Sequence, residues 1–264
     1  MKLLVFLFLL CFVLSCSEDS IQKDLKTSTT KKSVDAKTIK INNKPFRGEK
    51  ISGEALPQKT LDCFYPIDTI AKIYVYRDIV GGLEEQFHRV QSLITKKGEV
   101  HVIVQVYSSD LRMLETLNYI YPSLELYDHL VANRKKESAR AEVFKNKMFP
   151  KTNKDTVVFV SRFPGHLDST VIIKKIKRTV LENNEEELVI LKSKIKILSY
   201  LDSIFFDLLN PFTNKKETIS AQQITKYGKG IGLVEWHFPN KKTYFRLEKI
   251  IDEKEWLRIK KIMQ

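Results

Sequence analysis

The chain has 264 residues and a formal net charge of +13, from 45 Lys and Arg against 32 Asp and Glu, and it contains three cysteines. Three cysteines exclude a small fold held by several disulfides, and the length suffices for one substantial hydrophobic core. The basic residues are mainly lysines dispersed along the chain, which favours a solvated surface over a concentrated nucleic-acid patch.

The N-terminal segment has the composition of an export signal. Lys2 precedes an apolar run of twelve residues, from Leu3 to Leu14. A membrane-spanning helix needs about 20 apolar residues, whereas the apolar part of a secretory signal has roughly 7 to 15. The run therefore predicts a cleaved signal peptide.

The residues that end this run, Val13-Leu14-Ser15-Cys16, follow the order apolar, any, small and cysteine, which resembles the lipobox of bacterial lipoproteins. The resemblance implies that residues 1–15 are removed and that Cys16 becomes a first residue carrying fatty acids such as palmitate. It implies a lipid anchor in the bacterial cell envelope and leaves no role for nucleic acid. Ser17 resembles the second residue of lipoproteins passed to the outer membrane. The sequence leaves open whether the protein lies on the periplasmic or the outer face of that membrane.

Residues 16–59 contain few large apolar side chains, so burial cannot offset the entropy of ordering them. We expect a lipidated flexible tether there, followed by a β-rich domain over residues 60–264 that could divide into 60–150 and 151–264. Cys63 lies in an apolar segment and is predicted to be a buried small side chain, with a reactive thiol as the alternative.

Five segments between Ala71 and Val131 alternate apolar and polar residues with period two, which predicts half-buried strands. They are Ile73–Tyr76, Gln86–Leu93, Val100–Tyr107, Met113–Tyr121 and Leu124–Val131. Short links between them predict antiparallel pairing, because parallel pairing needs a long crossover. Pairing Val100 with Tyr119, and Tyr119 with Leu126, would place Leu130 on the apolar face.

The remaining chain continues this pattern, with expected strands at Val157–Val160, Val171–Val180, Leu188–Ile197 and Ile204–Leu209. A hairpin is expected from Ile231–Phe238 and Lys241–Ile250, with Phe238 opposite Lys241. A C-terminal helix is expected after Asp252, with Trp256 on its buried face. The fold class is therefore mainly β, an antiparallel meander forming an open barrel or sandwich, with a short C-terminal helix.

No motif for catalysis, metal or cofactor is found. The histidines at 88, 101, 129, 166 and 237 show no ligand spacing, and those that can be registered lie roughly 12 Å apart or more, too far to share a metal. The glycines from Gly228 to Gly232 lead into a strand and lack the Lys-Ser/Thr pair of a phosphate loop. We therefore expect a non-enzymatic protein without metal or cofactor.

One charged group falls on the expected apolar face. The predicted register puts Arg89 and Glu115 on either side of Val104, with Asp128 diagonal to Glu115. Buried charges are costly unless paired. The three residues are therefore a candidate ligand groove, with an ion pair at the sheet edge or a local register error as alternatives.

Beyond the lipobox, the layout resembles small β-rich envelope lipoproteins of undefined function. This resemblance favours a binding or accessory module for a protein or envelope component. The alternative is a carrier of lipid or another apolar ligand in the concavity of a curved sheet, and an enzyme without a known motif ranks third.

Overall fold

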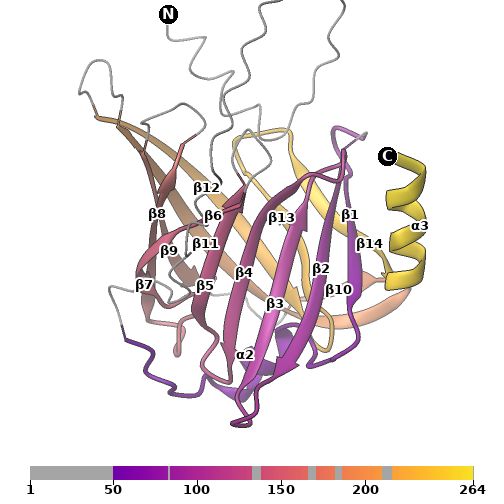
Figure 1. Ribbon diagram of the computed structural model, residues 1–264, viewed down its shortest axis with the longest axis horizontal. Coiled ribbons are helices and arrows are strands. Elements are labelled where there is room, and N and C mark those ends of the chain that lie inside the picture. The colour runs from indigo at the N-terminus through magenta and orange to yellow at the C-terminus, as the bar shows by residue number, and fades with distance from the viewer. Residues whose placement is uncertain are drawn as a thin grey trace, which may run out of the picture. The chain divides into compact units, whose positions relative to one another are not determined.

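The computed structural model describes residues 50–82, 84–132, 138–165, 171–181, 186–209 and 216–263 (Figure 1). The predicted signal peptide, Cys16, most of the predicted tether and His166 lie outside the described residues. Pro45–Gln264 forms one compact unit. None of the described helices is long and apolar enough to cross a membrane.

The first five strands form the predicted antiparallel meander, in which each strand pairs with the next. Alternating apolar residues and short turns are sufficient to explain these hairpins. The strands are β1 (Lys72–Asp78), β2 (Glu85–Ile94), β3 (Val100–Tyr107), β4 (Met113–Tyr121) and β5 (Glu125–Ala132).

Nine further strands extend the sheet, and the last strand pairs with β1, so that the two halves of the chain are joined. They are β6 (Ser138–Arg140), β7 (Glu142–Asn146), β8 (Thr156–Pro164), β9 (Val171–Val180), β10 (Glu187–Ile190), β11 (Ser193–Leu209), β12 (Lys216–Gly228), β13 (Gly232–His237) and β14 (Tyr244–Asp252). The order is β6-β5-β4-β3-β2-β1-β14-β13-β12-β11-β9-β8-β7, with β10 paired to β11 outside this path.

The two edge strands meet, because only Ala141 separates β6 from β7. The Ala141 amide donates to the carbonyl of His129 on β5 at 2.8 Å, while Val143 already pairs with Ser161 on β8. The sheet therefore curls into a nearly closed barrel. The predicted fold class is confirmed, and the barrel is the correct one of the two architectures.

Two predicted registers are wrong by two residues. Val100 lies opposite Tyr121 rather than Tyr119, and the last hairpin pairs His237 with Tyr244, so its turn is longer than predicted. A shift of two keeps each side chain on its predicted face. The pairing of Tyr119 with Leu126 is confirmed.

A β-bulge opposite Asn118 and Tyr119 changes the faces of β5. Tyr127 is the extra residue, so the inward alternation restarts at His129, which is fully buried, and Leu130 faces outward. The placement of Leu130 on the apolar face is therefore wrong, because alternation in sequence does not reveal a bulge.

One end of the barrel is closed by α2 (Gln58–Cys63) and the residues that follow it. Phe64 makes edge contacts with Tyr119 and Phe149, with ring centroids 5.3 and 5.5 Å apart. Cys63 is buried, as predicted. This aromatic packing fills the interior between Phe64, Tyr119 and Phe149.

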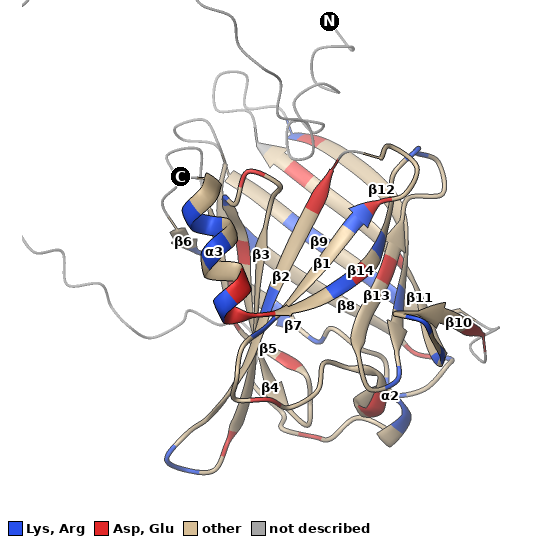
Figure 2. Ribbon diagram, turned by 90° about the vertical axis from the view of Figure 1, so that its right-hand side faces the viewer, with Lys and Arg blue, Asp and Glu red and all other residues tan. Residues whose placement is uncertain are grey.

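The C-terminal helix α3 (Glu253–Met263) lies on the outer face of the sheet, as Figures 1 and 2 show. Trp256 is 1% exposed and packs with Ile73, Val75, Phe87 and Tyr107. The helix follows Asp252, as predicted, and the Asp252 carboxylate caps its first turn by accepting the Glu255 amide at 2.8 Å.

Candidate functional site

The structure does not bring the three predicted groove residues together. Val90, not Arg89, lies opposite Val104, so Arg89 points outward and binds Glu253 of α3 at 2.7 Å. Asp128 also faces outward and pairs with Arg140 at 2.9 Å. Glu115 alone faces the barrel interior, opposite Val106. The actual strand registers and the β5 bulge account for this separation.

Glu115 belongs instead to an interior polar cluster. Its Oε2 atom lies 3.1 Å from Nε2 of His129 and 3.3 Å from Nζ of Lys174. Burial alone would raise the pKa of Glu115, but Lys174 and His129 together hold it well below its ordinary value. The carboxylate is thus ionised and its charge is compensated within the barrel wall.

Two buried polar atoms in the same part of the interior, Nδ1 of His129 and Oγ of Ser161, have no hydrogen-bond partner among the described residues. Ser161 lies cross-strand from Lys174. Both residues are 0% exposed, so a substrate has no access to them. We interpret the cluster as a polar seam where the barrel closes. Sequence reasoning missed Lys174 because it comes from the distant β9 strand.

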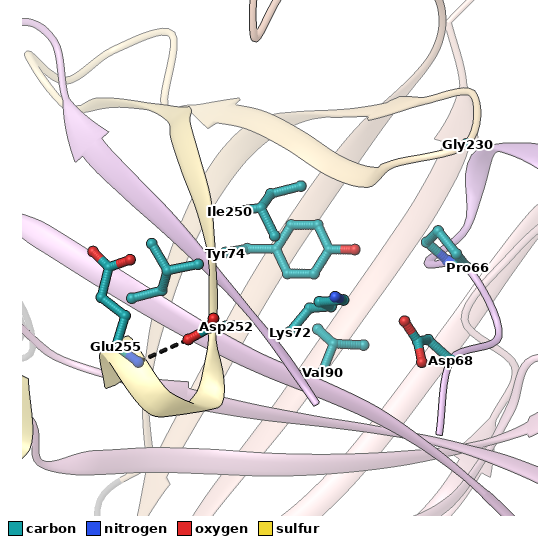
Figure 3. Close-up of a pocket in the computed structure, with 10 residues that line it drawn as sticks. Pro66, Asp68, Lys72, Tyr74, Val90, Gly230, Ile250, Asp252 and Glu255 are labelled. Atoms are coloured by element: carbon teal, nitrogen blue, oxygen red, sulfur yellow. Dashed lines mark hydrogen bonds between the residues drawn. The ribbon is translucent and has the colours of Figure 1, made fainter. Parts of the chain in front are cut away.

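A separate cavity of about 510 Å³ lies at the α2 end of the barrel (Figure 3). The cavity is lined by Pro66, Asp68, Lys72, Tyr74, Val90, Gly230, Ile250, Ile251, Asp252 and Glu255.

The floor of this cavity, called the α2-end pocket below, comes from three adjacent strands. Alternation along β1 turns Lys72 and Tyr74 to the inner face, and cross-strand pairing places Val90 beside Lys72 and Ile250 beside Tyr74. The opposite wall is the segment after α2 together with the turn at Gly230, whose amide binds the Asp62 carbonyl at 2.8 Å. The pocket is therefore built from well-separated parts of the chain.

Tyr74 is the most distinctive group in the α2-end pocket. The residue is 4% exposed, its ring makes an edge contact with Tyr65 at 5.1 Å, and its hydroxyl points into the pocket in Figure 3. Within the described residues, no group makes a hydrogen bond to that hydroxyl. Burial, with a smaller contribution from the Asp68 carboxylate, raises the pKa of Tyr74, so the phenol is protonated.

The rim of the pocket is acidic in a chain whose net charge is +13. It carries three carboxylates, Asp68, Asp252 and Glu255, against one ammonium, Lys72, while a second ammonium, Lys249, lies 3.6 Å from Glu255 outside the lining. Oδ1 of Asp68 accepts a hydrogen bond from the Ile70 amide, and Oδ1 of Asp252 accepts one from the Glu255 amide, both at 2.8 Å. The second carboxylate oxygen of each residue takes no part in these two hydrogen bonds. The pocket thus combines an apolar floor with a negative rim.

Sequence reasoning missed the α2-end pocket. No motif marks it, because its residues lie on β1, β2, β14, α3 and two connecting segments. Among the described residues, no group of His, Cys, Asp and Glu side chains could hold a metal ion. The groups that line the pocket can bind a ligand through charge, through the Tyr74 hydroxyl and through apolar contact.

The comparisons do not assign a family. No family model matches the chain, and no curated protein is similar to it. One solved structure, named "putative lipoprotein" from Parabacteroides distasonis, has 14% sequence identity and a TM-score of 0.43. The match covers 71% of this chain and 98% of that chain. A likeness of this degree carries no argument about fold or function, so the class rests on the structure itself, a nearly closed antiparallel barrel with a pocket at one end.

Proposed function

We propose that this chain is a lipid-anchored protein of the bacterial cell envelope, held in the outer membrane by Cys16, that acts as a non-enzymatic binding module. The lipobox-like residues Val13 to Cys16 support the anchor. The α2-end pocket is the binding site, and its occupant is a group of a partner protein or envelope component.

The observation that carries this proposal is the Tyr74 hydroxyl. The Tyr74 ring is almost fully buried, and its hydroxyl points into the pocket in Figure 3. Among the described residues, no group makes a hydrogen bond to this hydroxyl. A ligand in the pocket can therefore donate to it or accept from it in place of water.

The lining defines the class of ligand. Val90, Ile250 and the Tyr74 ring suit an apolar body, while the excess of carboxylates at the rim suits a positive charge. A lysine-like side chain, with a four-carbon stem and an ammonium group, has both properties. We therefore assign the pocket to a basic, partly apolar group.

Calorimetric titration with three six-carbon probes tests the assignment: hexylammonium, hexanol and hexanoate. Hexylammonium should bind most tightly and hexanoate least. The Asp68→Asn/Glu255→Gln variant should weaken hexylammonium binding about tenfold or more and leave hexanol binding unchanged. The control variant, Glu99→Gln/Glu217→Gln, removes two exposed charges elsewhere and should bind like the wild type. Equal or tighter binding of hexanoate would contradict the proposal.

A carrier function is the second candidate, and a different observation favours it. At the barrel end away from α2, the inner-face side chains of Ile172, Phe206 and Ile219 are only partly buried. A side chain on the inner face of a barrel can be exposed only to the barrel interior or to the opening at the barrel end. An apolar ligand would cover these groups.

Fluorescence titration with cis-parinaric acid, a fluorescent fatty acid, tests the carrier function. Phe206→Ala should weaken binding, while Phe205→Ala on the outer face of the same strand should not. Absence of saturable binding by the wild type would remove the carrier function without affecting the α2-end pocket.

A further inference from the structure

The side of α3 that faces away from the barrel carries an unusual combination of residues. Lys254, Arg258 and Lys261 follow the spacing i, i+4, i+7 and therefore share one face. All three are exposed. Leu257 and Ile262, which are 58% and 83% exposed, flank them. This set of five residues is called the α3 outer face below.

The cations of the α3 outer face have no counter-charge within the described residues. The helix has two acidic residues, and both are used elsewhere: Glu253 binds Arg89 at 2.7 Å, and Glu255 lies 3.6 Å from Lys249. The fourth cation of the helix, Lys260, lies over the rings of Tyr107 and Trp256. Three unpaired positive charges thus remain on the exposed side, and Figure 2 shows Lys and Arg positions along α3 on the outside of the barrel.

The helix itself is firmly held, so its outer face is a fixed surface. Trp256 and Ile259 pack against the sheet, and Asp252 caps the first turn. Exposed Leu257 and Ile262 therefore do not result from a helix that lacks a packing face. A partner for this surface must supply negative charge and an apolar medium next to each other.

We propose that the α3 outer face binds the headgroup region of an anionic lipid bilayer. A bilayer interface offers phosphate groups to the cations and acyl chains to Leu257 and Ile262 at the same depth. The proposal rests on the proposed envelope location, because the anchor at Cys16 would keep the barrel near such a surface. A tethered protein needs only weak additional affinity to stay docked. This contact would fix the orientation that a flexible tether alone leaves free.

Vesicle sedimentation of a chain that cannot be acylated separates this proposal from the lipid anchor. The protein is the chain from residue 16 onward carrying Cys16→Ala. It should sediment with phosphatidylcholine vesicles that contain phosphatidylglycerol, and not with pure phosphatidylcholine vesicles. Raising the salt concentration should release it, because exposed charges are screened.

The Lys254→Gln/Arg258→Gln/Lys261→Gln variant should partition into the anionic vesicles roughly a hundred-fold less than the wild type. Leu257→Ser/Ile262→Ser should also weaken binding, since it removes the apolar contact. The matched control, Lys97→Gln/Lys154→Gln/Lys177→Gln, removes the same charge from three exposed positions on other elements. An equal loss of vesicle binding in this control would overturn the proposal. So would the absence of binding by the chain that carries only Cys16→Ala, and neither outcome depends on whether Cys16 is acylated in the cell.

Discussion

Arg178 on β9 and Asp202 on β11 face each other inside the barrel and form two hydrogen bonds of 2.7 and 2.8 Å. Both side chains are buried, at 7% and 2% exposed. Phe149, Tyr200 and Tyr227 surround the guanidinium, 4.9, 5.1 and 5.9 Å from their ring centroids. The pair therefore links two strands in the middle of the aromatic core.

Replacing Asp202 with Asn should destabilise the protein by about 3 to 5 kcal/mol, because it leaves a buried guanidinium without its counter-charge. Urea unfolding, followed by circular dichroism, measures the loss. The control is Asp207→Asn, which breaks the half-exposed pair with Lys216 and should cost no more than about 1 kcal/mol. Similar losses in both variants would show that burial of the Arg178 pair does not matter.

His88 should make stability depend on pH near neutrality. Burial, opposed weakly by the Glu115 carboxylate, lowers the pKa of His88 to about 3 from the ordinary 6.5. Below pH 6.5 the unfolded chain takes up a proton that the folded chain does not, so stability falls with pH until about pH 3.

Between pH 7 and pH 5 this residue should account for a loss of about 2 kcal/mol. The His88→Gln variant lacks the titrating group, so urea titrations should show a smaller loss of stability between pH 7 and pH 5. Parallel pH profiles for the two proteins would contradict the assignment.

Glu115 should make the stability of the fold depend on pH in a more acidic range than His88 does. Its pKa is lowered in the folded protein by Lys174 and His129, so its contribution is complete above the ordinary value of 4.5 and is lost as pH falls below it. Glu115→Gln should therefore be less stable than wild type at pH 7, by roughly 1 kcal/mol, and the difference should shrink at pH 3. Glu142→Gln, at an exposed pair on the outer face, is the matched control and should show no such pH-dependent difference.

The sheet could be predicted from sequence because its alternation is strong and its turns are short. The valines of Val100–Tyr107 face inward as expected. The bulge that adds Tyr127 and the closure through Ala141 could not be predicted, because each depends on a partner strand.

The candidate site was harder to predict for the same reason. Only a register with regular pairing throughout groups Arg89, Glu115 and Asp128. The residues that gather in the structure, such as Tyr74, Asp68 and Glu255, lie in different elements and share no sequence motif. A pocket built at the meeting of several elements leaves no periodic signal in any one of them.

Trp256 should hold α3 on the barrel. Its replacement by Ala removes a side chain that is 1% exposed and should cost about 3 to 5 kcal/mol. Amide hydrogen exchange should show faster exchange throughout α3 in this variant. Leu257→Ala, at the exposed neighbouring position, should leave exchange unchanged, and equal acceleration in both would argue against packing by Trp256 as the cause.

Metabolic labelling with a radioactive fatty acid tests directly whether a lipid on Cys16 holds the barrel at the cell envelope. The wild-type chain should carry label, whereas the Cys16→Ala variant should carry none and should accumulate as the uncleaved precursor. Equal labelling of the two proteins, or no label on the wild type, would contradict the proposed lipid anchor.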